Sequence, residues 1–524
     1  MMRRVRVLSF VAMTATPLAL FAQAKPAPGA APAAAAVAVD PCPIELMQPT
    51  DLGIANLQRP KLAGVKSAVE ANKVMTDVSK ILFNETKMTN KLGRDMLLAQ
   101  FIMFYVQYAD SAKRGDIGFP GDKTQYVDML KYTDSLFTVV EKAEPKCAGT
   151  VLQWRNFKPF TDRVRAAYAA IGAGAADTAE KLATRAMILN KNGPQPYDVL
   201  WRVAKIRADS AQLKSDAAAT DKNQALEISF LQTAADRLEG DTLNPAVRSN
   251  FLFTLGRIQH EMGDAKNDKA AKDKLYRGAA KAYLQVLKEF PSGDESQYAM
   301  QGVTMTSSIV GDTSISNAAV TLVKASPDKF SDATLAQAGV LSTAANRNAD
   351  ALMFFNAAVK RNPYSRDYQY YLAAMMYDSK QTTEMIPVVH KLVDMDPSNP
   401  DNITLFTYGF TGISNATKDP TVKKWAIDSV AYYGKLAEDM PHRLSYTDFE
   451  RQPNRTLLLG TVENKAKVAR AFTIEFEFFG KDGVVVQKST ATVASVAPGG
   501  TGSFKIDFPI GGVVGVRYAP LPLK

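Results

Sequence analysis

Histidine and cysteine, the side chains that most often act as bases, nucleophiles or metal ligands, are scarce in this chain of 524 residues. The three histidines are His260, His390 and His442, and none has another histidine or a cysteine at the spacing of a metal site. The two cysteines, Cys42 and Cys147, are not paired with a histidine that would activate a thiolate. We therefore expect a protein that is not an enzyme and that has no catalytic residues, no metal and no cofactor.

Two glycine-containing segments share only part of the pattern of phosphate-binding loops. No strand precedes Gly172-Ala173-Gly174, and Asp177 stands where a third glycine is needed, so we interpret this segment as a turn between two helices. Residues 118–123 lack the spacing of a phosphate loop and are interpreted as an ordinary loop. Carboxylates are numerous, so an enzyme with an unrecognised carboxylate site is kept as an alternative.

The first 24 residues have the features of a secretory signal peptide in the expected order. Three arginines, Arg3, Arg4 and Arg6, precede a mostly apolar stretch over residues 7–21, and Ala22-Gln23-Ala24 fits a cleavage site. The stretch is too short to span a bilayer, and no later segment is long enough to be a transmembrane helix. We expect cleavage near Ala24 and a periplasmic or secreted protein.

The expected export favours a disulfide between the two cysteines, because disulfides persist in oxidising compartments. We predict a disulfide between Cys42 and Cys147, which would close a loop of about 100 residues and stabilise the fold by ~4–5 kcal/mol in the chain-entropy model. The alternative is two unpaired thiols, or cysteines that lie too far apart to be bridged.

The chain carries a formal net charge of +10. This mild charge favours solubility and a weak attraction to anionic polymers of the cell envelope. No basic run is interleaved with aromatic residues, and export removes the usual target, so we expect no nucleic-acid partner.

Composition and periodicity divide the chain into segments. Residues 25–50 are rich in alanine and proline and are expected to form a flexible linker. Residues 51–160 form an N-terminal helical region and residues 161–445 a longer helical array, because apolar residues recur every three or four positions. Prolines that end helical segments recur at Pro291, Pro327, Pro363, Pro397 and Pro441, at spacings of 36, 36, 34 and 44 residues. A period of this length predicts a solenoid of repeated helix pairs.

The residues at fixed offsets from these prolines carry a resemblance to a known family. The predicted second helices contain a small–aromatic–small pattern, as in Ala279, Tyr283, Val286 and in Ala351, Phe355, Ala358. The predicted first helices contain Leu252, Leu255, Gly256 and Leu335, Ala338, Gly339. This pattern resembles the tetratricopeptide repeat (TPR), most clearly over residues 249–441, and implies stacked antiparallel helix pairs that bind protein partners.

One repeat carries a lysine-rich insertion, Ala265 to Lys274. It is either a patch for an anionic partner or a solvated helical extension with Asp–Lys pairs at helical spacing.

The pattern changes to period two near the C-terminus. Phe472, Ile474, Phe476 and Phe478 alternate with polar residues, and Lys481-Asp482-Gly483 predicts a hairpin turn into a second strand. Residues 490–496 and 503–508 are expected to form a further strand pair, so residues 453–524 are predicted to form a small antiparallel β-sandwich. Leu459 to Asn464 and Pro498-Gly499 resemble the FxLYD-type immunoglobulin-like domain, which implies an accessory binding or spacer module.

The resemblance to TPR arrays, whose first helices line a concave groove, suggests where a ligand would bind. The register places Tyr370, Tyr371 and Tyr377 at or near the groove, facing the small neighbours Ala336, Val340 and Thr343. Phe253 and Arg257 are the corresponding candidates in an earlier repeat. The alternative is that the tyrosines only pack between repeats.

The predicted fold class is therefore mainly α, a tetratricopeptide-like α-solenoid followed by a small antiparallel β-sandwich. We predict an exported, non-catalytic scaffold that binds a protein or peptide partner in the bacterial cell envelope. A peptidoglycan- or polysaccharide-associated envelope module is an alternative, and an enzyme with an unrecognised carboxylate site is a second one.

Overall fold

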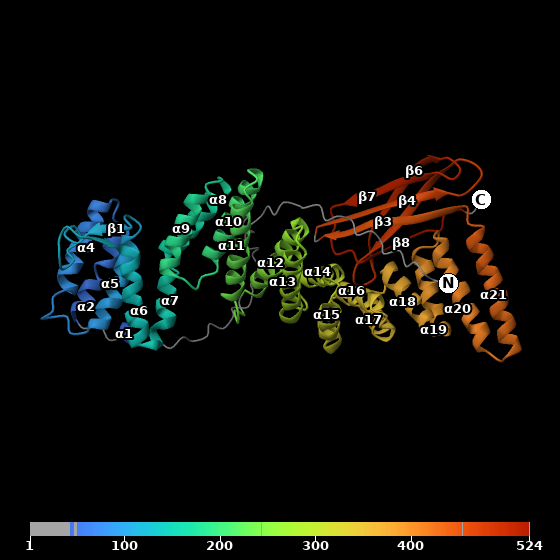
Figure 1. The fold of residues 1–524 in the computed structure, drawn as a ribbon, viewed down its shortest axis with the longest axis horizontal. Helices are drawn as coiled ribbons and strands as arrows, with labels where there is room; N and C mark the ends of the chain where they lie inside the picture. Colours follow the sequence, from blue (N-terminus) through green and yellow to red (C-terminus); the bar gives the residue numbers. More distant parts are fainter. Residues whose placement is uncertain (1–41, 47–49, 243, 453, 523–524) are drawn as a thin grey trace. The chain divides into compact units, whose positions relative to one another are not determined.

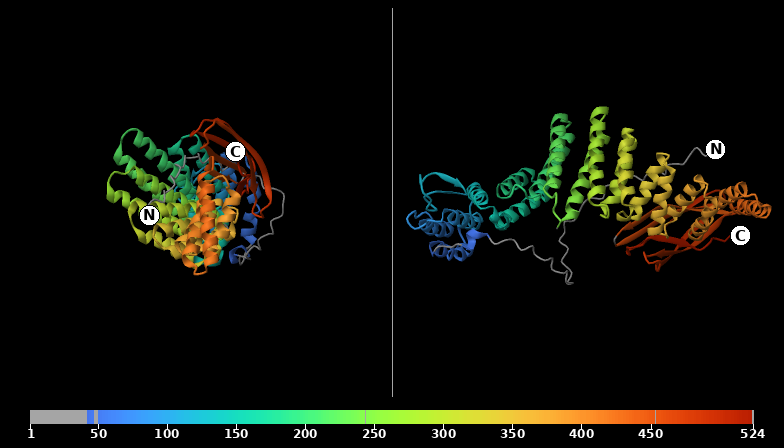
Figure 2. Two further views of the ribbon diagram at one scale, coloured as in Figure 1. Left: turned by 90° about the vertical axis from the view of Figure 1, so that its right-hand side faces the viewer. Right: turned by 90° about the horizontal axis from the view of Figure 1, so that it is seen from below.

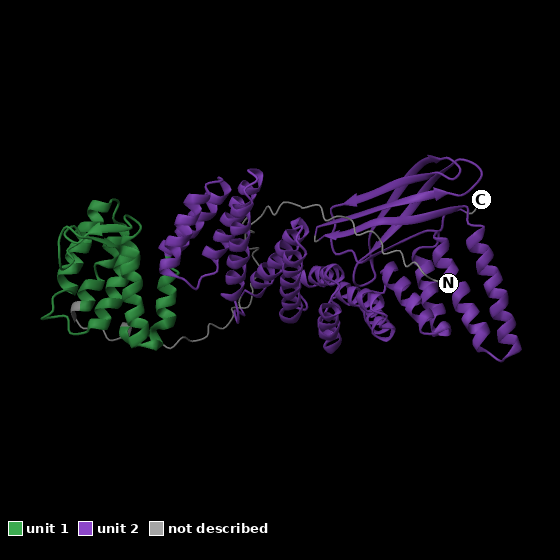
Figure 3. Cartoon of the chain, viewed as in Figure 1, with its two compact units in different colours: residues 1–157 green, residues 158–524 purple. Residues whose placement is uncertain are grey.

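The structure of the chain is a computed structural model that describes residues 42–46, 50–242, 244–452 and 454–522. The predicted signal peptide, residues 1–24, lies outside the described residues, as does most of the predicted linker. The chain divides into two compact units, residues 1–157 and 158–524, which are coloured separately in Figure 3.

The first unit consists of short helices and one small hairpin. Its elements are α1 (Pro43–Leu46), α2 (Thr50–Asn56), α3 (Arg59–Gly64), α4 (Ala68–Leu82), α5 (Lys91–Tyr105), β1 (Ser111–Lys113), β2 (Tyr126–Asp128), α6 (Met129–Ala143), the 3-10 turn η1 (Pro145–Cys147) and α7 (Ala148–Arg155). Helix α5 lies at the centre, because every side chain from Met96 to Met103 is buried. A helix that is apolar on all sides has to be surrounded by other elements.

Sequence periodicity missed the hairpin of β1 and β2, whose strands are only three residues long. Helix α6 begins directly after the hairpin, at Met129. The reason is local, because the side chain of Asp128 accepts hydrogen bonds from the backbone N–H groups of Leu130 and Lys131 and so fixes the helix start there.

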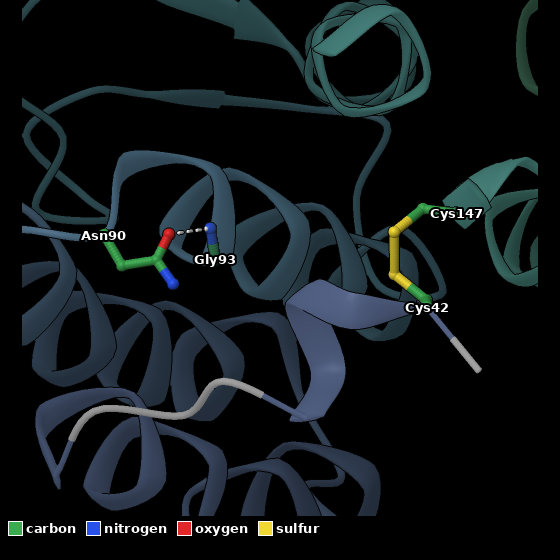
Figure 4. The surroundings of a disulfide bond; sticks show 4 residues. All are labelled: Cys42, Asn90, Gly93 and Cys147. Carbon is green, nitrogen blue, oxygen red and sulfur yellow. Dashed lines mark hydrogen bonds between the residues drawn. A yellow bond between two sulfur atoms is a disulfide. The ribbon is translucent and has the colours of Figure 1, made fainter. Parts of the chain in front are cut away.

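A disulfide joins Cys42 to Cys147 across the first unit (Figure 4). Both cysteines are buried, and their Cα atoms are 4.4 Å apart. The bond ties α1 to η1, so residues 42–46 of the segment expected to be a linker belong to the first unit. In the same view the side chain of Asn90 accepts a hydrogen bond of 2.8 Å from Gly93 N and caps α5 (Figure 4).

Helix pairs make up most of the second unit, and consecutive pairs lie side by side in Figure 1 and Figure 2. The pairs are α8 (Lys158–Gly172) with α9 (Ala176–Leu189), α10 (Gln195–Leu213) with α11 (Ala217–Asp236), α12 (Pro245–Ala265) with α13 (Lys269–Glu289), α14 (Glu295–Val310) with α15 (Thr313–Ala325), α16 (Asp332–Ala344) with α17 (Asn348–Arg361), α18 (Arg366–Asp378) with α19 (Thr382–Met395), and α20 (Pro400–Ala416) with α21 (Pro420–Glu438). A 3-10 turn, η2 (Pro327–Lys329), precedes α16. The solenoid of helix pairs therefore extends upstream of the clearest repeats to Lys158.

Prolines end the second helices where the sequence predicts. Residues before proline, such as Phe290, Asn362 and Asp396, have left the helical region, with φ values of −129°, −135° and −135°. Steric contact with the proline ring disfavours the helical conformation at the preceding residue. This explains why the repeat length could be counted from prolines.

Glycines on the first helices allow aromatic rings of the second helices to approach closely. A Cβ atom at Gly256 would lie 2.6 Å from the ring of Tyr283, and one at Gly302 in the next pair would lie 2.4 Å from the same ring. A Cβ at Gly339 would likewise lie 2.8 Å from Phe355. The small–aromatic pattern in the sequence therefore corresponds to direct packing within and between helix pairs, and the fold is TPR-like.

The C-terminal part of the second unit is the predicted antiparallel sandwich. One sheet has the order β3 (His442–Gln452), β4 (Arg455–Asn464), β7 (Thr501–Phe508), and the other has the order β6 (Val485–Val496), β5 (Arg470–Phe479), β8 (Gly515–Tyr518). The alternating residues Phe472, Ile474, Phe476 and Phe478 all point into the core.

Two details of the sandwich differ from the sequence analysis. The sheet begins at His442, upstream of the predicted start at residue 453. The sequence did not indicate β3, because this strand is polar and half-exposed and carries no clear apolar alternation. Residues 490–496 and 503–508 are not a strand pair of their own. The first segment is the end of the long strand β6, which pairs with β5, and the second belongs to β7, which pairs with β4 in the other sheet.

Hydrogen bonds hold the sandwich against the turns between helix pairs. The hydroxyl of Tyr518 donates to Asp396 Oδ1 over 2.5 Å and accepts from Ser398 N over 3.0 Å. Leu444 N donates to Ser398 O over 3.0 Å, and the ring of Tyr364 stacks on Phe479 at a centroid distance of 5.4 Å. We call this contact, formed by residues 362–366 and 396–402 with β3, β5 and β8, the junction.

Candidate binding surface on the first helices

The three tyrosines singled out in the sequence all lie on α18, where they play different parts. Tyr370 is exposed, and its ring contacts that of Tyr371. Tyr371 is half-buried and stacks on Phe355 of the preceding pair at 5.2 Å, so for this residue packing between repeats is part of its role. Tyr377 is half-buried and contacts Tyr408 of α20 at 5.3 Å. The side chain of Ser365 caps α18 and fixes where the helix begins.

Phe253 and Arg257 lie on α12, at a distance in sequence from the tyrosines. Phe253 is half-buried and its ring lies 5.9 Å from Tyr283 and 6.2 Å from Tyr298. Arg257 forms an ion pair of 2.5 Å with Glu261 one turn further along the same helix. Phe253 therefore contributes to a surface shared by α12 and α14, whereas Arg257 is already balanced by a carboxylate.

Helix α14 supplies apolar residues that the sequence analysis missed. Tyr298, Met305 and Ile309 are 42%, 42% and 46% exposed, compared with 39% for Tyr370. Their spacing of seven and four residues places them on one face of the helix. This spacing could have indicated the stripe in the sequence, but periodicity alone does not distinguish an exposed apolar stripe from a buried one.

Helix α16 follows the apolar residues of α14 and precedes the tyrosines of α18, and it carries smaller side chains. Val340 is half-buried, and the hydroxyl of Thr343 donates to Gly339 O and reaches Met375 Sδ of α18 at 3.6 Å. Ala336, expected at the surface, is buried in the core because it faces the inside of its pair. The first helices from α12 to α20 thus carry a series of half-buried and exposed apolar side chains, which we call the first-helix surface: Phe253, Tyr298, Met305, Ile309, Val340, Tyr370, Tyr371, Tyr377 and Tyr408.

Carboxylates border the tyrosines of this surface. Burial, together with the nearby Asp401 carboxylate and Tyr408, raises the pKa of Tyr370. Asp401 is paired in turn with Arg443 of the sandwich. Burial also raises the pKa of Asp378, the last residue of α18. Hydroxyl groups and acidic side chains therefore lie at the edge of an aromatic surface.

The histidines lie on three separate elements, α12, α19 and β3. The pKa of His260 is lowered by burial, and its ring meets that of Tyr276 edge to face at 5.1 Å. His390 contacts Phe406 at 4.6 Å. His442 is buried, and burial with a contribution from Arg470 lowers its pKa to about 4. Within residues 42–46, 50–242, 244–452 and 454–522, no group of three or more His, Cys, Asp or Glu side chains could hold a metal ion.

In the glycine segment at residues 172–174, Gly172 ends α8, and Ala173 and Gly174 lie in the turn that leads to α9. An open hollow of about 420 Å³ lies beside it and is bordered by Gly174, Asp177 and Arg207. Arg207 forms ion pairs of 2.6 Å with both Asp177 and Glu180. Its charge is therefore already neutralised, and the hollow does not offer a free cation to a phosphate group.

The lysine-rich insertion lengthens α12 and α13. Lys266 pairs with Asp221, and the side chain of Asp268 caps α13 by accepting from Ala271 N over 2.7 Å. These contacts fit the interpretation as a solvated helical extension.

A search of the described part of the chain finds no helix with the length and apolar character needed to cross a membrane.

Comparison with known proteins places the chain beside helical-repeat structures at low similarity. No family model and no curated protein matches the sequence. Similar solved structures include pilF of Pseudomonas aeruginosa, with 11% identity, coverage of 54% of this chain and 91% of that chain, and a TM-score of 0.20. A thermophilic TPR protein of Thermus thermophilus has 12% identity, coverage of 41% and 98%, and a TM-score of 0.21. A tetratricopeptide repeat protein of Parabacteroides merdae has 14% identity, coverage of 54% and 94%, and a TM-score of 0.23. At these scores the likeness carries no argument about function, and the description of the fold rests on the helix pairs themselves.

Proposed function

We propose that this protein is a non-catalytic scaffold that binds a protein or peptide segment along the first-helix surface. The observation that carries the proposal is the series of apolar side chains on α12, α14, α18 and α20, several of which remain exposed although the helices beneath them are well packed. Exposed apolar groups that lie together and are bordered by polar ones are typical of protein interaction sites. Tyrosine suits this role because its ring provides contact area at small entropic cost and its hydroxyl can form hydrogen bonds.

We further propose that the scaffold works in the bacterial cell envelope, as a periplasmic or secreted protein. The support comes from the signal-like order of residues 1–24 and from the disulfide between Cys42 and Cys147. Fractionation of cells that make the protein, with N-terminal sequencing of the product, tests this part. A cytoplasmic protein that retains residues 1–24 would contradict it.

The C-terminal sandwich, with its resemblance to FxLYD-type domains, is proposed as an accessory module. It is held to the solenoid by the junction and covers the N-terminal ends of α18 and α20. In this proposal the sandwich limits how a partner lies on the first-helix surface.

Site-specific photo-crosslinking tests the scaffold function directly. A photoreactive phenylalanine analogue replaces Tyr298 or Tyr370, which are exposed on first helices, and Lys391, exposed on the second helix α19, serves as the control position. We expect the same partner to be crosslinked from positions 298 and 370 and not from position 391. No partner at either tyrosine, or the same products from all three positions, would refute the proposal.

A further inference from the structure

The first and second helices of the later pairs carry opposite charge. Helices α14, α16, α18 and α20 contain five carboxylates, Glu295, Asp332, Asp367, Asp378 and Asp401, and one basic residue, Arg366. In the second helices of the same pairs, α15, α17, α19 and α21, lysine and arginine outnumber aspartate and glutamate by seven to five. A chain that is basic as a whole therefore presents its acidic side on the first helices.

The acidic side chains and the tyrosines share the same face of α18 and α20. Tyr370, Tyr377 and Asp378 fall within about one third of the circumference of α18 at 100° per residue. Asp401 and Tyr408 are two turns apart on α20 and also lie on one face. The two helices meet there, because Tyr377 contacts Tyr408 and the Asp401 carboxylate acts on Tyr370.

Not all of these carboxylates are balanced by a cation. Arg366 pairs with Asp367 over 2.6 Å and also with the buried Asp396 over 3.5 Å, so one guanidinium serves two carboxylates. Asp401 is paired with Arg443. Asp378 is exposed, and within the described part of the chain no hydrogen bond or ion pair reaches it.

The place of Asp378 on its helix is unusual for an unpaired acid. It is the last residue of α18, where the negative end of the helix dipole disfavours a carboxylate. Although the side chain is solvent-exposed, neighbouring protein atoms desolvate it in part, which adds to this cost and raises its pKa. A cation bound beside Asp378 would relieve both effects. The sandwich contacts the opposite, N-terminal end of α18 through Tyr446 and Arg366, and Asp378 is exposed at the other end of the helix.

Building on the proposed scaffold function, we propose that the first-helix surface at α18 and α20 selects a basic partner segment and holds an arginine or lysine side chain of it. Tyr370, Tyr377 and Tyr408 offer aromatic ring faces to the cation, and Asp378 offers the carboxylate. Rings and a carboxylate together fit a guanidinium best, because it stacks on aromatic faces and pairs with carboxylates in a planar geometry. The excess of carboxylates over basic residues on these first helices disfavours an acidic segment.

A peptide pair that differs only in charge tests the inference. A fluorescein-labelled peptide of about 12 residues carries three arginines spaced by leucine, proline and serine, and its partner carries citrulline, the neutral isostere, at the same three positions. Fluorescence anisotropy with the whole chain measures both affinities. We expect the arginine peptide to bind roughly 5- to 30-fold more tightly, which corresponds to one well-placed cation–aromatic and ion-pair contact.

Matched variants distinguish a specific arginine-binding site from general electrostatic attraction. Asp378→Asn should remove most of the arginine preference, and Tyr370→Ala should weaken both peptides. Asp394→Asn makes the same charge change at an exposed position of the second helix α19 and should leave both affinities unchanged. Equal binding of the two peptides, or equal effects of Asp378→Asn and Asp394→Asn, would overturn the inference.

The outcomes distinguish this inference from the proposed function. Crosslinking of a partner at Tyr370 without any preference for arginine would overturn the basic-segment inference and leave the scaffold proposal in place. Sedimentation that shows the whole chain binding a second copy of itself, lost in Asp378→Asn, would also overturn it, because the basic second helices would then be the occupant.

Discussion

Replacement of Tyr518 by phenylalanine removes one hydroxyl group from the junction between solenoid and sandwich. Burial and the neighbouring Asp396 raise the pKa of Tyr518 well above 10, so the hydroxyl stays protonated and donates to Asp396. The same oxygen accepts from Ser398 N. Because Asp396 is fully buried, the variant leaves a carboxylate with one donor fewer and a buried N–H group without its acceptor.

The expected cost follows from these two losses. A hydrogen bond to a charged group contributes ~1.5–3 kcal/mol, and an unsatisfied buried polar group costs ~1–3 kcal/mol. The two effects arise from one hydroxyl and are not additive, so we expect opening of the junction to become easier by ~2–4 kcal/mol. Amide exchange that depends on this opening should then be roughly 30- to 700-fold faster.

Hydrogen–deuterium exchange of peptides that cover β8 and residues 396–402 measures this effect, and the junction contains its own control. The hydroxyl of Tyr446 is buried there as well, but no described residue forms a hydrogen bond with it. Tyr446→Phe keeps the ring that lies 4.4 Å from the Arg366 guanidinium and should change exchange by less than about twofold. Equal effects of Tyr518→Phe and Tyr446→Phe would refute the argument that the Tyr518 hydrogen bonds hold the junction.

Three further changes have defined outcomes. Gly302→Ala, whose Cβ would lie 2.4 Å from a buried tyrosine ring, should destabilise the second unit by ~1–3 kcal/mol in urea unfolding, whereas Gly434→Ala, with 3.9 Å of room on α21, should be neutral or slightly stabilising. Double replacement of Cys42 and Cys147 by serine should destabilise the first unit by ~4–5 kcal/mol in urea unfolding, since the bond closes a loop with a sequence separation of 105, and a reductant should shift only the wild type. His442 has a pKa of about 4 in the folded chain, below its ordinary 6.5, so the stability contributed by its neutral form is complete above pH 6.5 and falls by about 3 kcal/mol as the pH drops towards 4. The difference in thermal stability between the wild type and His442→Phe, followed across this pH range, measures the loss. A difference that does not change with pH would count against this prediction.

The repeat register could be predicted because its causes are local. A proline excludes helix at the residue before it, and a glycine opposite an aromatic ring is needed wherever two helices touch, as at Gly339 and Phe355. Each rule operates within one or two turns of chain. Spacings counted between such residues therefore located the helix pairs without any knowledge of distant contacts.

The exposed side of each helix was harder to predict. Tyr371 and Tyr370 are neighbours in sequence, but one stacks on Phe355 and the other is open. Tyr298, Met305 and Ile309 form a stripe that a buried helix could equally carry. The exposure of a side chain depends on which helices pack against its own helix. The repeat period alone does not specify how the helices are arranged in space.

The junction could not be predicted from the sequence, for a different reason, and it affects how the proposed function should be tested. Asp396 and Tyr518 are 122 residues apart, and no periodic pattern marks a contact of one carboxylate with one hydroxyl at that separation. Once the contact exists, the sandwich cannot be deleted without consequence for the solenoid. Deletion would leave Asp396 without the Tyr518 hydroxyl and Arg366 without the Tyr446 ring, at the N-terminal end of the helix that carries Tyr370. Loss of partner binding after such a truncation would therefore not separate a binding role of the sandwich from damage to α18. Asp378→Asn changes an exposed side chain at the end of α18 opposite the junction, and Tyr370→Ala leaves the contacts of Asp396 with Tyr518 and of Arg366 with Tyr446 in place. This makes both variants sharper tests of what the first-helix surface binds.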